Sequence, residues 1–372
     1  MPVNPVLSEF IPEIHNSDIR CVLAVTGGGT SAISDLLAVP GASRTLLEAT
    51  VPYDGNALAD YIRRAPEQSA SETTARQLAM SGYQRARVLN GGDEHIVGLG
   101  CTAALATDRV RRGTDRCFIA AQTMGQTHTR SIAFDAGTRA EQERACSDAI
   151  IHLLATVAGV TEQPLTLSIA DVGDDHADAP KAWQDLLAGR NTTTSPEQST
   201  RLLFSGSFNP LHQGHEEMAR ISEEMTRERT VLEISTFNVD KPPIDFIEMR
   251  NRQQAIGDRY PLVYTNAPTF VTKAQLFPGV TFIVGVDTVT RIGSARYYHS
   301  AQHSDPEENL QSGLRSLSDA NCRFLVFGRK IESGFESLAS VDIPDALRSL
   351  CIEIPEDRFR HDLSSTEIRR RS

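Results

Sequence analysis

The stretch "LLFSGSFNPLHQGHEEMARISEEM", residues 202–225, decides the fold of the second half of the chain. An apolar run is followed by a turn that contains Gly206 and Pro210, and then by an amphipathic run. This order predicts a strand, a loop and a helix, with the loop at the carboxyl end of the strand. His212 and His215 lie at the start of the predicted helix, where unpaired N–H groups favour phosphate. On the residues alone, the pair either donates hydrogen bonds to phosphoryl oxygens or caps the helix at the surface.

In the rest of the chain, short apolar runs alternate with amphipathic segments, and this alternation predicts two α/β domains. Between about residues 20 and 160, the apolar runs CVLAVT, IVGLGC and CFIAAQT alternate with helical segments. From residue 201 the predicted strands are RLLFSGS, TVLEIST, GVTFIVGVD and RFLVFGR, with helices between them, as in a parallel sheet buried on both faces. The segment DVGDDHADAP is acidic and is predicted to be rich in turns. We expect one domain over residues 1–165, a linker over 166–200 and a second domain over 201–372.

Composition excludes several classes of protein. The chain has 372 residues, of which 40% are hydrophobic, and its net charge is −11. A reader of the nucleic-acid backbone usually has a basic surface, so we expect no nucleic-acid partner. No apolar stretch approaches the roughly 18 to 20 residues that a membrane span needs, and the N-terminal segment lacks the pattern of a secretory signal. We therefore expect a cytoplasmic protein without a membrane partner.

The six cysteines are scattered along the chain and form no CxxC pair. In a chain of this length they are typical of buried apolar positions or free thiols. The spacing does not favour a zinc site, so we predict no protein-bound metal.

Residues 206–215, Gly-Ser-Phe-Asn-Pro-Leu-His-Gln-Gly-His, resemble the G-[ST]-F-[DN]-P-x-H-x-G-H signature of the nucleotidylyltransferase superfamily. The resemblance implies a Rossmann-like domain in which His212 and His215 are catalytic donors to the nucleotide phosphates. It also implies Mg²⁺ bound through the ATP phosphates. The implied nucleotide-binding residues of this loop are Gly206, Ser207, Phe208, Asn209 and Gly214.

Three later segments resemble the other blocks of that superfamily, in the same order. The block from Asn238 to Arg250 implies that Lys241 has a catalytic role at the phosphate of the acceptor and that Asn238 and Arg250 bind the acceptor. Asp245 or a neighbour is expected to cap the next helix. The segment FIVGVDT implies that Gly285 and Asp287 bind the adenosine and ribose. The C-terminal LSSTEIR implies a clamp on the triphosphate; its residues are Ser364, Ser365, Thr366 and Arg369, with Arg369 in a catalytic role.

Within the superfamily, the last block and the segment NAPTFVTKAQLFPGVTFIVGVDTVTRI look closest to nicotinamide or nicotinate mononucleotide adenylyltransferases. The resemblance implies that the partners are ATP and a mononucleotide acceptor, and that the product belongs to NAD biosynthesis. Two alternatives stay open. One is a cytidylyl- or adenylyltransferase for another phosphorylated acceptor, and the other is an altered nucleotide-binding or scaffold protein without activity.

The first half resembles the C-terminal domain of the CinA family, many members of which deamidate nicotinamide mononucleotide. The resemblance rests on the segments VTGGG, VPGAS and VPYD. The family serine falls on Ala24, its glutamate on Leu23 and its lysine on Leu58, so the residues that deamidation needs are missing. The resemblance therefore implies a domain that keeps the fold, has lost the deamidase activity, and binds a nucleotide or forms a homo-oligomer. The implied ligand site comprises Thr26, Gly27, Gly28, Tyr53 and Arg139; the turn at 26–29 could also offer N–H groups to an anion.

Overall fold

The computed structural model describes residues 5–92, 94–108, 113–195, 200–237, 242–298, 305–331 and 334–359. The chain forms two compact units. The first comprises Met1–Gln184 and Asn238–Arg250, and the second comprises Asp185–Phe237 and Asn251–Ser372. The α/β class that the sequence predicts for both halves is confirmed.

The first unit is built on a six-stranded mixed sheet with the order β2-β1-β3-β4-β5-β6. β1 is parallel to β2 and β3, and the strands from β3 to β6 are antiparallel to one another. The strands are β1 (Arg20–Thr26), β2 (Leu46–Thr50), β3 (Ile96–Ala104), β4 (Arg116–Gln122), β5 (Gln126–Phe134) and β6 (Ala170–Asp178). The helices are α1 (Pro5–Asn16), α2 (Ser31–Ala38), α3 (Ala42–Thr45), α4 (Gly55–Tyr61), α5 (Glu72–Asn90), α6 (Arg139–Val157) and α7 (Lys181–Leu187), the last of which crosses into the second unit.

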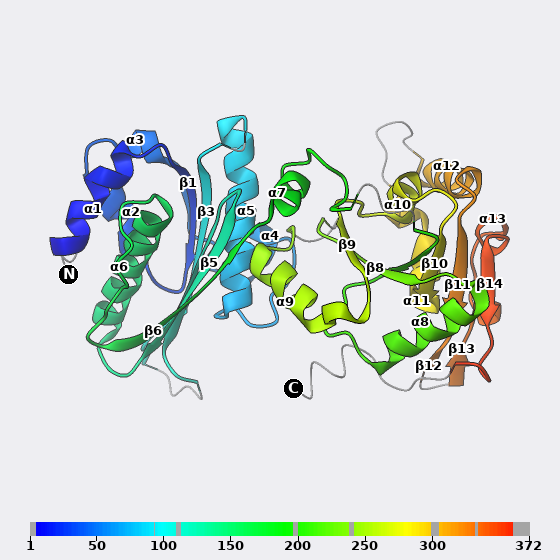
Figure 1. Ribbon diagram of the computed structural model, residues 1–372. Helices are drawn as coiled ribbons and strands as arrows, with labels where there is room; N and C mark the ends of the chain where they lie inside the picture. The colour runs from blue at the N-terminus through cyan, green and yellow to red at the C-terminus, as the bar shows by residue number, and fades with distance from the viewer. Residues whose placement is uncertain are drawn as a thin grey trace. The chain divides into compact units, whose positions relative to one another are not determined.

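Helices cover both faces of this sheet (Figure 1): α1, α2 and α6 lie on one face, and α5 lies on the other. The apolar run of β1 is divided between the two faces. Leu23 and Val25 join the core beneath α6, whereas Ala24 packs with residues of α4 and α5. A Cβ at Gly98 or Gly100 of β3 would lie within 2.5 Å of α5 backbone atoms. These glycines therefore allow α5 to pack directly against the centre of the sheet.

The acidic segment was predicted to be rich in turns, and this prediction was wrong. Residues 170–178 form the edge strand β6, which pairs along its whole length with β5. Most of its side chains are exposed. An edge strand tolerates, and is protected by, such charges, because they discourage pairing with another chain.

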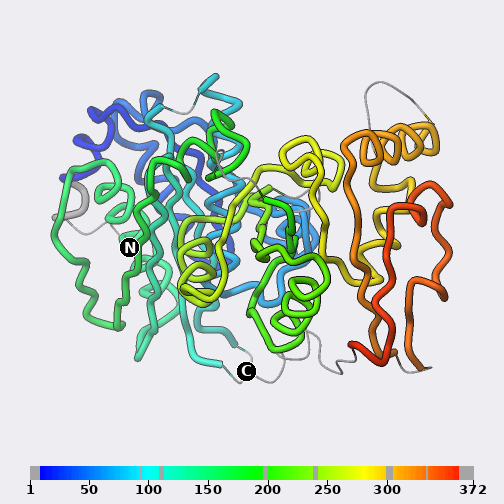
Figure 2. Tube along the Cα trace, turned by 45° about the vertical axis from the view of Figure 1, so that its right-hand side comes forward, coloured from blue at the N-terminus to red at the C-terminus, as the bar shows by residue number. Residues whose placement is uncertain are grey.

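The second unit contains a six-stranded sheet with the order β14-β11-β10-β7-β8-β9, in which every neighbouring pair is parallel. Figure 2 shows β14 in red beside β11 in orange. The strands are β7 (Leu202–Ser205), β8 (Thr230–Ser235), β9 (Leu262–Thr265), β10 (Thr281–Gly285), β11 (Arg323–Phe327) and β14 (Cys351–Ile354), with a hairpin of β12 (Arg329–Ile331) and β13 (Gly334–Glu336). The helices are α8 (Gln213–Thr226), α9 (Phe246–Ile256, which begins in the first unit), α10 (Phe270–Leu276), α11 (Val286–Ile292), α12 (Pro306–Asp319) and α13 (Asp345–Arg348), with 3-10 turns at Gly257–Arg259, Ala295–Tyr297 and Leu338–Ser340. The parallel sheet expected for this part of the chain is confirmed.

Two further expectations concern the whole chain. All six cysteines are free thiols and five are buried; burial raises the pKa of Cys21 to about 12, which keeps that thiol protonated. None of the helices in the described ranges is long and apolar enough to cross a bilayer.

Candidate functional site

The loop that follows β7 is built around the ring of Phe208. This ring is buried, with 1% of the residue exposed, and a Cβ at Gly206 would lie 2.9 Å from its Cζ. Glycine at 206 therefore lets the loop fold back over the aromatic ring. Ser207 and Asn209, on either side of Phe208, are exposed. The inward residue anchors the loop and its neighbours face solvent, where they can reach a ligand.

The two histidines lie at the start of α8. The rings of His212 and His215 are stacked, with centroids 3.7 Å apart, and Phe204 and Phe208 pack edge-on against His215 at 5.7 and 5.2 Å. The Nδ1 of His215 accepts the backbone N–H of His212 at 3.4 Å. With an acceptor at Nδ1, a neutral His215 ring carries its proton on Nε2, which can donate to another group. Gly214 is buried in this first helical turn.

The topology brings a second predicted block to the same edge of the sheet. β7 pairs with both β8 and β10, so the order of the strands reverses at β7. Ligands of open α/β sheets bind at such a reversal, at the carboxyl ends of the strands. Gly285 ends β10 and precedes α11, and a Cβ there would meet no protein atom within 4 Å. Asp287 accepts a hydrogen bond from Arg329 at 2.5 Å, and its side chain is 46% exposed.

Not every predicted residue joins this edge. Arg250 lies in the first unit, where its guanidinium pairs with both carboxylate oxygens of Asp175 at 3.0 and 2.6 Å and donates to the carbonyl of His176. This pair holds the pKa of Asp175 below its usual value. The predicted helix cap is confirmed, since Asp245 Oδ1 accepts the N–H of Glu248. Asn238, Lys241, Ser364, Ser365, Thr366 and Arg369 lie outside the described residues.

A buried ion pair beside the loop was not predicted. Glu233 of β8 is fully buried, and its carboxylate accepts hydrogen bonds from Lys273 of α10 at 2.6 and 2.7 Å and from the hydroxyl of Thr265 at 2.5 Å. The carbonyl of Glu233 accepts the N–H of Gly206 at 3.0 Å. The first residue of the signature loop is therefore attached to a rigid charged cluster. A lone Lys and a lone Glu 40 residues apart give no sequence signal for such a contact.

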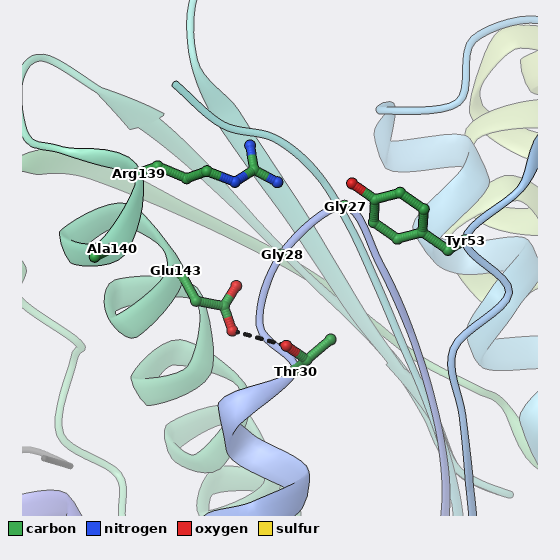
Figure 3. Close-up of a pocket in the computed structure, with 7 residues that line it drawn as sticks. All are labelled: Gly27, Gly28, Thr30, Tyr53, Arg139, Ala140 and Glu143. Carbon is green, nitrogen blue, oxygen red and sulfur yellow. Dashed lines mark hydrogen bonds between the residues drawn. The ribbon is translucent and has the colours of Figure 1, made fainter. Parts of the chain in front are cut away.

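The first unit contains a cavity of about 430 Å³. Figure 3 shows how it is formed by the turn after β1, by the segment before α4 and by the first turns of α6. Four of the five residues predicted for this site line it together, whereas Thr26 is buried at the end of β1. The lining residues are Gly27, Gly28, Thr30, Tyr53, Arg139, Ala140 and Glu143.

The sequence analysis did not identify Glu143, which lines the cavity and accepts several hydrogen bonds from the turn after β1. Its Oε2 accepts the N–H of Gly29 at 2.5 Å, and its Oε1 accepts the N–H of Ser31 at 3.0 Å and the hydroxyl of Thr30 at 3.1 Å. The carboxylate therefore holds the turn after β1 against α6. Arg139, one helical turn earlier, is exposed and donates to the carbonyl of Ala106 at 3.1 Å.

Comparisons with known proteins give one family match and several similar solved structures. The family model "cytidylyltransferase-like" matches residues 203–371. No curated protein matches the chain. Three solved structures are similar to it: the competence/damage inducible protein CihA from Agrobacterium tumefaciens (15% identity, 42% of this chain and 98% of that one, TM-score 0.38), a CinA superfamily protein from Escherichia coli (16%, 42% and 94%, 0.35) and a competence or damage-inducible protein from Enterobacter asburiae (19%, 41% and 94%, 0.34).

At these identities and TM-scores the likeness to the CinA proteins says nothing about the activity of this chain. The family match covers the second half of the sequence, including β7, the two histidines and the end of β10. The C-terminal part of the chain, residues 203–371, therefore matches a cytidylyltransferase-like domain, a type of domain of the nucleotidyltransferase superfamily.

Proposed function

We propose that the cytidylyltransferase-like domain transfers the adenylyl group of ATP to nicotinamide or nicotinate mononucleotide. An oxygen of the acceptor phosphate attacks the α-phosphorus of ATP, the bond between the α-phosphorus and the bridging oxygen breaks, and pyrophosphate leaves. The observation that supports the proposal best is the His212–His215 pair at the start of α8. The loop that carries the pair follows β7, the strand that pairs with β10.

The proposed chemistry needs donors rather than a covalent nucleophile. Negative charge builds on the phosphoryl and leaving oxygens as the bond to pyrophosphate breaks. Donors that are already oriented stabilise this charge without reorganising. We assign this role to the Nε2–H of His215, because Phe204 and Phe208 pack against its ring in T-shaped contacts and Nδ1 accepts the backbone N–H of His212. The first turn of α8 adds backbone N–H groups and the positive end of its dipole.

Mg²⁺ is proposed as an ion that ATP brings with it. When bound, it neutralises part of the triphosphate charge. The described residues contain no cluster of three or more His, Cys, Asp or Glu side chains that could hold an ion by themselves. Mg²⁺ usually keeps several water ligands and is bound through substrate phosphates and one or two carboxylates. Asp287 is the carboxylate at this edge of the sheet that could contribute.

The acceptor side of the proposal rests on the resemblance. We assign Lys241 and Asn238 to the acceptor and Arg369, with the serines and threonine beside it, to the triphosphate. Two anions must approach each other, so each needs its own counter-charge in a site with little water. Arg250 was assigned to the acceptor as well, but its guanidinium is paired with Asp175. Lys241 is therefore the cation that we expect to determine affinity for the acceptor.

The test is pyrophosphate release by the full chain with Mg²⁺ and ATP or CTP. The acceptors are nicotinamide mononucleotide, nicotinate mononucleotide, phosphopantetheine, glycerol 3-phosphate and choline phosphate. We expect release with ATP and one or both of the first two. Release only with CTP or another acceptor would assign a different substrate to the same domain. No release in any mixture would favour a nucleotide-binding or scaffold protein.

We also propose that the first unit has no deamidase activity. Ala24 and Leu58 occupy the positions at which the CinA resemblance places a serine and a lysine. Both are buried and pack in one apolar cluster with Ile62 and Leu78. An apolar cluster offers neither a nucleophile nor a base, which supports the loss of that reaction.

A further inference from the structure

In the cavity of the first unit, the carboxylate of Glu143 occupies the position at the glycine turn where an anionic ligand would bind. Backbone N–H groups that follow a strand and open a helix commonly bind an anionic ligand. Here the N–H groups of Gly29 and Ser31 and the hydroxyl of Thr30 all donate to the carboxylate of Glu143, at 2.5, 3.0 and 3.1 Å. Ser147, one turn further along α6, adds its hydroxyl at 3.4 Å. The anion-binding groups of the turn are therefore already satisfied by the chain itself.

The rest of the cavity remains accessible. Tyr53 is 65% exposed, and its ring faces the cavity from the side opposite α6 (Figure 3). Arg139 projects from α6 above the turn, and one N–H of its guanidinium donates to Ala106. Gly27 and Gly28 present backbone without side chains. A Cβ at Gly27 would clash with the backbone of Ala103 at 2.0 Å, and one at Gly28 would lie 2.7 Å from the Leu105 side chain. The cavity thus combines an aromatic ring, a cation and bare backbone.

We propose that this cavity binds a planar, phosphate-free ligand of nucleoside size, and that Glu143 excludes the corresponding phosphorylated compound. A volume of about 430 Å³ lies in the range of small-molecule sites. The ring of Tyr53 offers a face for stacking, and Arg139 offers donors to a carbonyl or carboxylate oxygen. A phosphate placed at the turn would be repelled by the Glu143 carboxylate, which already accepts the N–H groups of Gly29 and Ser31 that the phosphate would need. A phosphate held by Arg139 alone would gain little, because exposed ion pairs are weak.

The test uses the full chain and its single tryptophan. Trp183 lies in the first unit, so its fluorescence reports the thermal unfolding of that unit. Two matched pairs of probes are compared: adenosine with AMP, and nicotinamide riboside with nicotinamide mononucleotide. Because the second unit is proposed to bind nucleotides, only shifts that disappear in Tyr53→Ala are assigned to the cavity. Tyr53 is so exposed that this variant is expected to fold normally.

For the wild-type chain, we expect at least one unphosphorylated probe at saturating concentration to raise the unfolding midpoint by about 2–4 °C. Its phosphorylated partner should give no Tyr53-dependent shift. In Glu143→Ala the preference should reverse, with a gain in affinity for the phosphorylated partner of about ten-fold or more. Glu141→Ala removes the same charge from the same helix and leaves the bonds of Glu143 to the turn in place. It loses the capping bonds to Thr138, so its midpoint without ligand should fall, but its preference between the two probes should stay that of the wild type.

Three results would overturn the proposal. One is a Tyr53-dependent shift of the wild type by the phosphorylated probe that equals or exceeds the shift by its partner. Another is the absence of any Tyr53-dependent shift. The third is a folded Glu143→Ala chain that still rejects the phosphorylated probe. The first two comparisons need only the wild type and Tyr53→Ala, so the proposal stays testable if Glu143→Ala does not fold.

Discussion

His215 packs against two phenylalanine rings and accepts the backbone N–H of His212, so its ring is held in place at the start of α8. We predict that His215→Ala folds normally and lowers turnover by about 10² to 10³, the usual cost of one such donor. The measurement is pyrophosphate release with saturating substrates. Gln213→Ala is the control, because Gln213 is exposed one residue after His212. Unchanged turnover in His215→Ala would remove this residue from the mechanism.

His152 is a buried histidine that should contribute to the acid sensitivity of the first unit. Its Nδ1 accepts from the guanidinium of Arg130 at 3.1 Å and lies 3.4 Å from the Thr156 hydroxyl. Burial, followed by the charge of Arg130, lowers the pKa of His152 to about 4. The unfolded chain, with an ordinary histidine, therefore binds the proton more readily, so this contribution to stability is present above about pH 6.5 and is lost as the pH falls towards 4.

The acid sensitivity is tested with His152→Asn, because the side-chain oxygen of asparagine can still accept a hydrogen bond from Arg130 but does not titrate. Between pH 7 and pH 5, the unfolding midpoint followed by Trp183 fluorescence should fall further in the wild type than in the variant, by about 2–4 °C. Parallel pH dependence in the two proteins would show that another group is responsible.

At this scale, sequence patterns located the signature loop but not the contacts that complete the sites. His212, His215, Gly206 and Phe208 are neighbours in the chain, so a local motif finds them. Glu143 binds Gly29 across 114 residues, and Lys273 binds Glu233 across 40. Such pairs exist only after the chain has folded, and a single Glu or Lys on a helix gives no local sign of its partner.

Among the elements, β8 and α10 are joined by the buried pair of Glu233 and Lys273. Removing one partner leaves a buried charge, so we predict that Lys273→Met lowers the free energy of unfolding by about 3–5 kcal/mol. The double variant Glu233→Leu/Lys273→Met should recover most of this loss, because apolar residues often replace a buried pair at little cost. Urea unfolding monitored by circular dichroism measures both effects. A double variant as unstable as the single one would show that the pair itself, and not the unpaired charge, is responsible.

The prediction of elements succeeded where strands are apolar and failed where a strand is exposed. Most residues of the strands that coincide with predicted apolar runs are buried. These strands are β1, β3, β4, β7, β8, β10 and β11. β6 has mostly exposed, acidic side chains, so its composition resembles a turn region. What makes it a strand is pairing with β5, and such pairing leaves no apolar alternation to detect.

For the molecule as a whole, two units and their α/β class follow from the alternation of apolar and amphipathic segments. The same alternation does not predict that residues 238–250 belong to the first unit. It depends on contacts such as those of Arg250 with Asp175 and of the Phe246 N–H with the Thr127 hydroxyl, which join positions 75 and 119 residues apart. Sequence patterns report local periodicity and have no means of showing which unit a connecting segment joins.

The apolar environment of Ala24 and Leu58 predicts that the chain does not deamidate nicotinamide mononucleotide. Incubation of the full chain with this compound, without ATP, should release no ammonia above the uncatalysed rate. The same assay on Tyr53→Ala serves as the control for the cavity of the first unit. Ammonia release at an enzymatic rate that Tyr53→Ala abolishes would contradict the predicted loss of activity.

The central claim, adenylyl transfer by the cytidylyltransferase-like domain, is tested most directly by following labelled ATP. The full chain is incubated with Mg²⁺, nicotinamide or nicotinate mononucleotide, and ATP labelled at either the α- or the γ-phosphate. Our account predicts that the α-label enters the dinucleotide and the γ-label enters pyrophosphate, in equal amounts, and that both fall by about 10² to 10³ in His215→Ala. Transfer of the γ-label to the acceptor, or no transfer of either label, would contradict it.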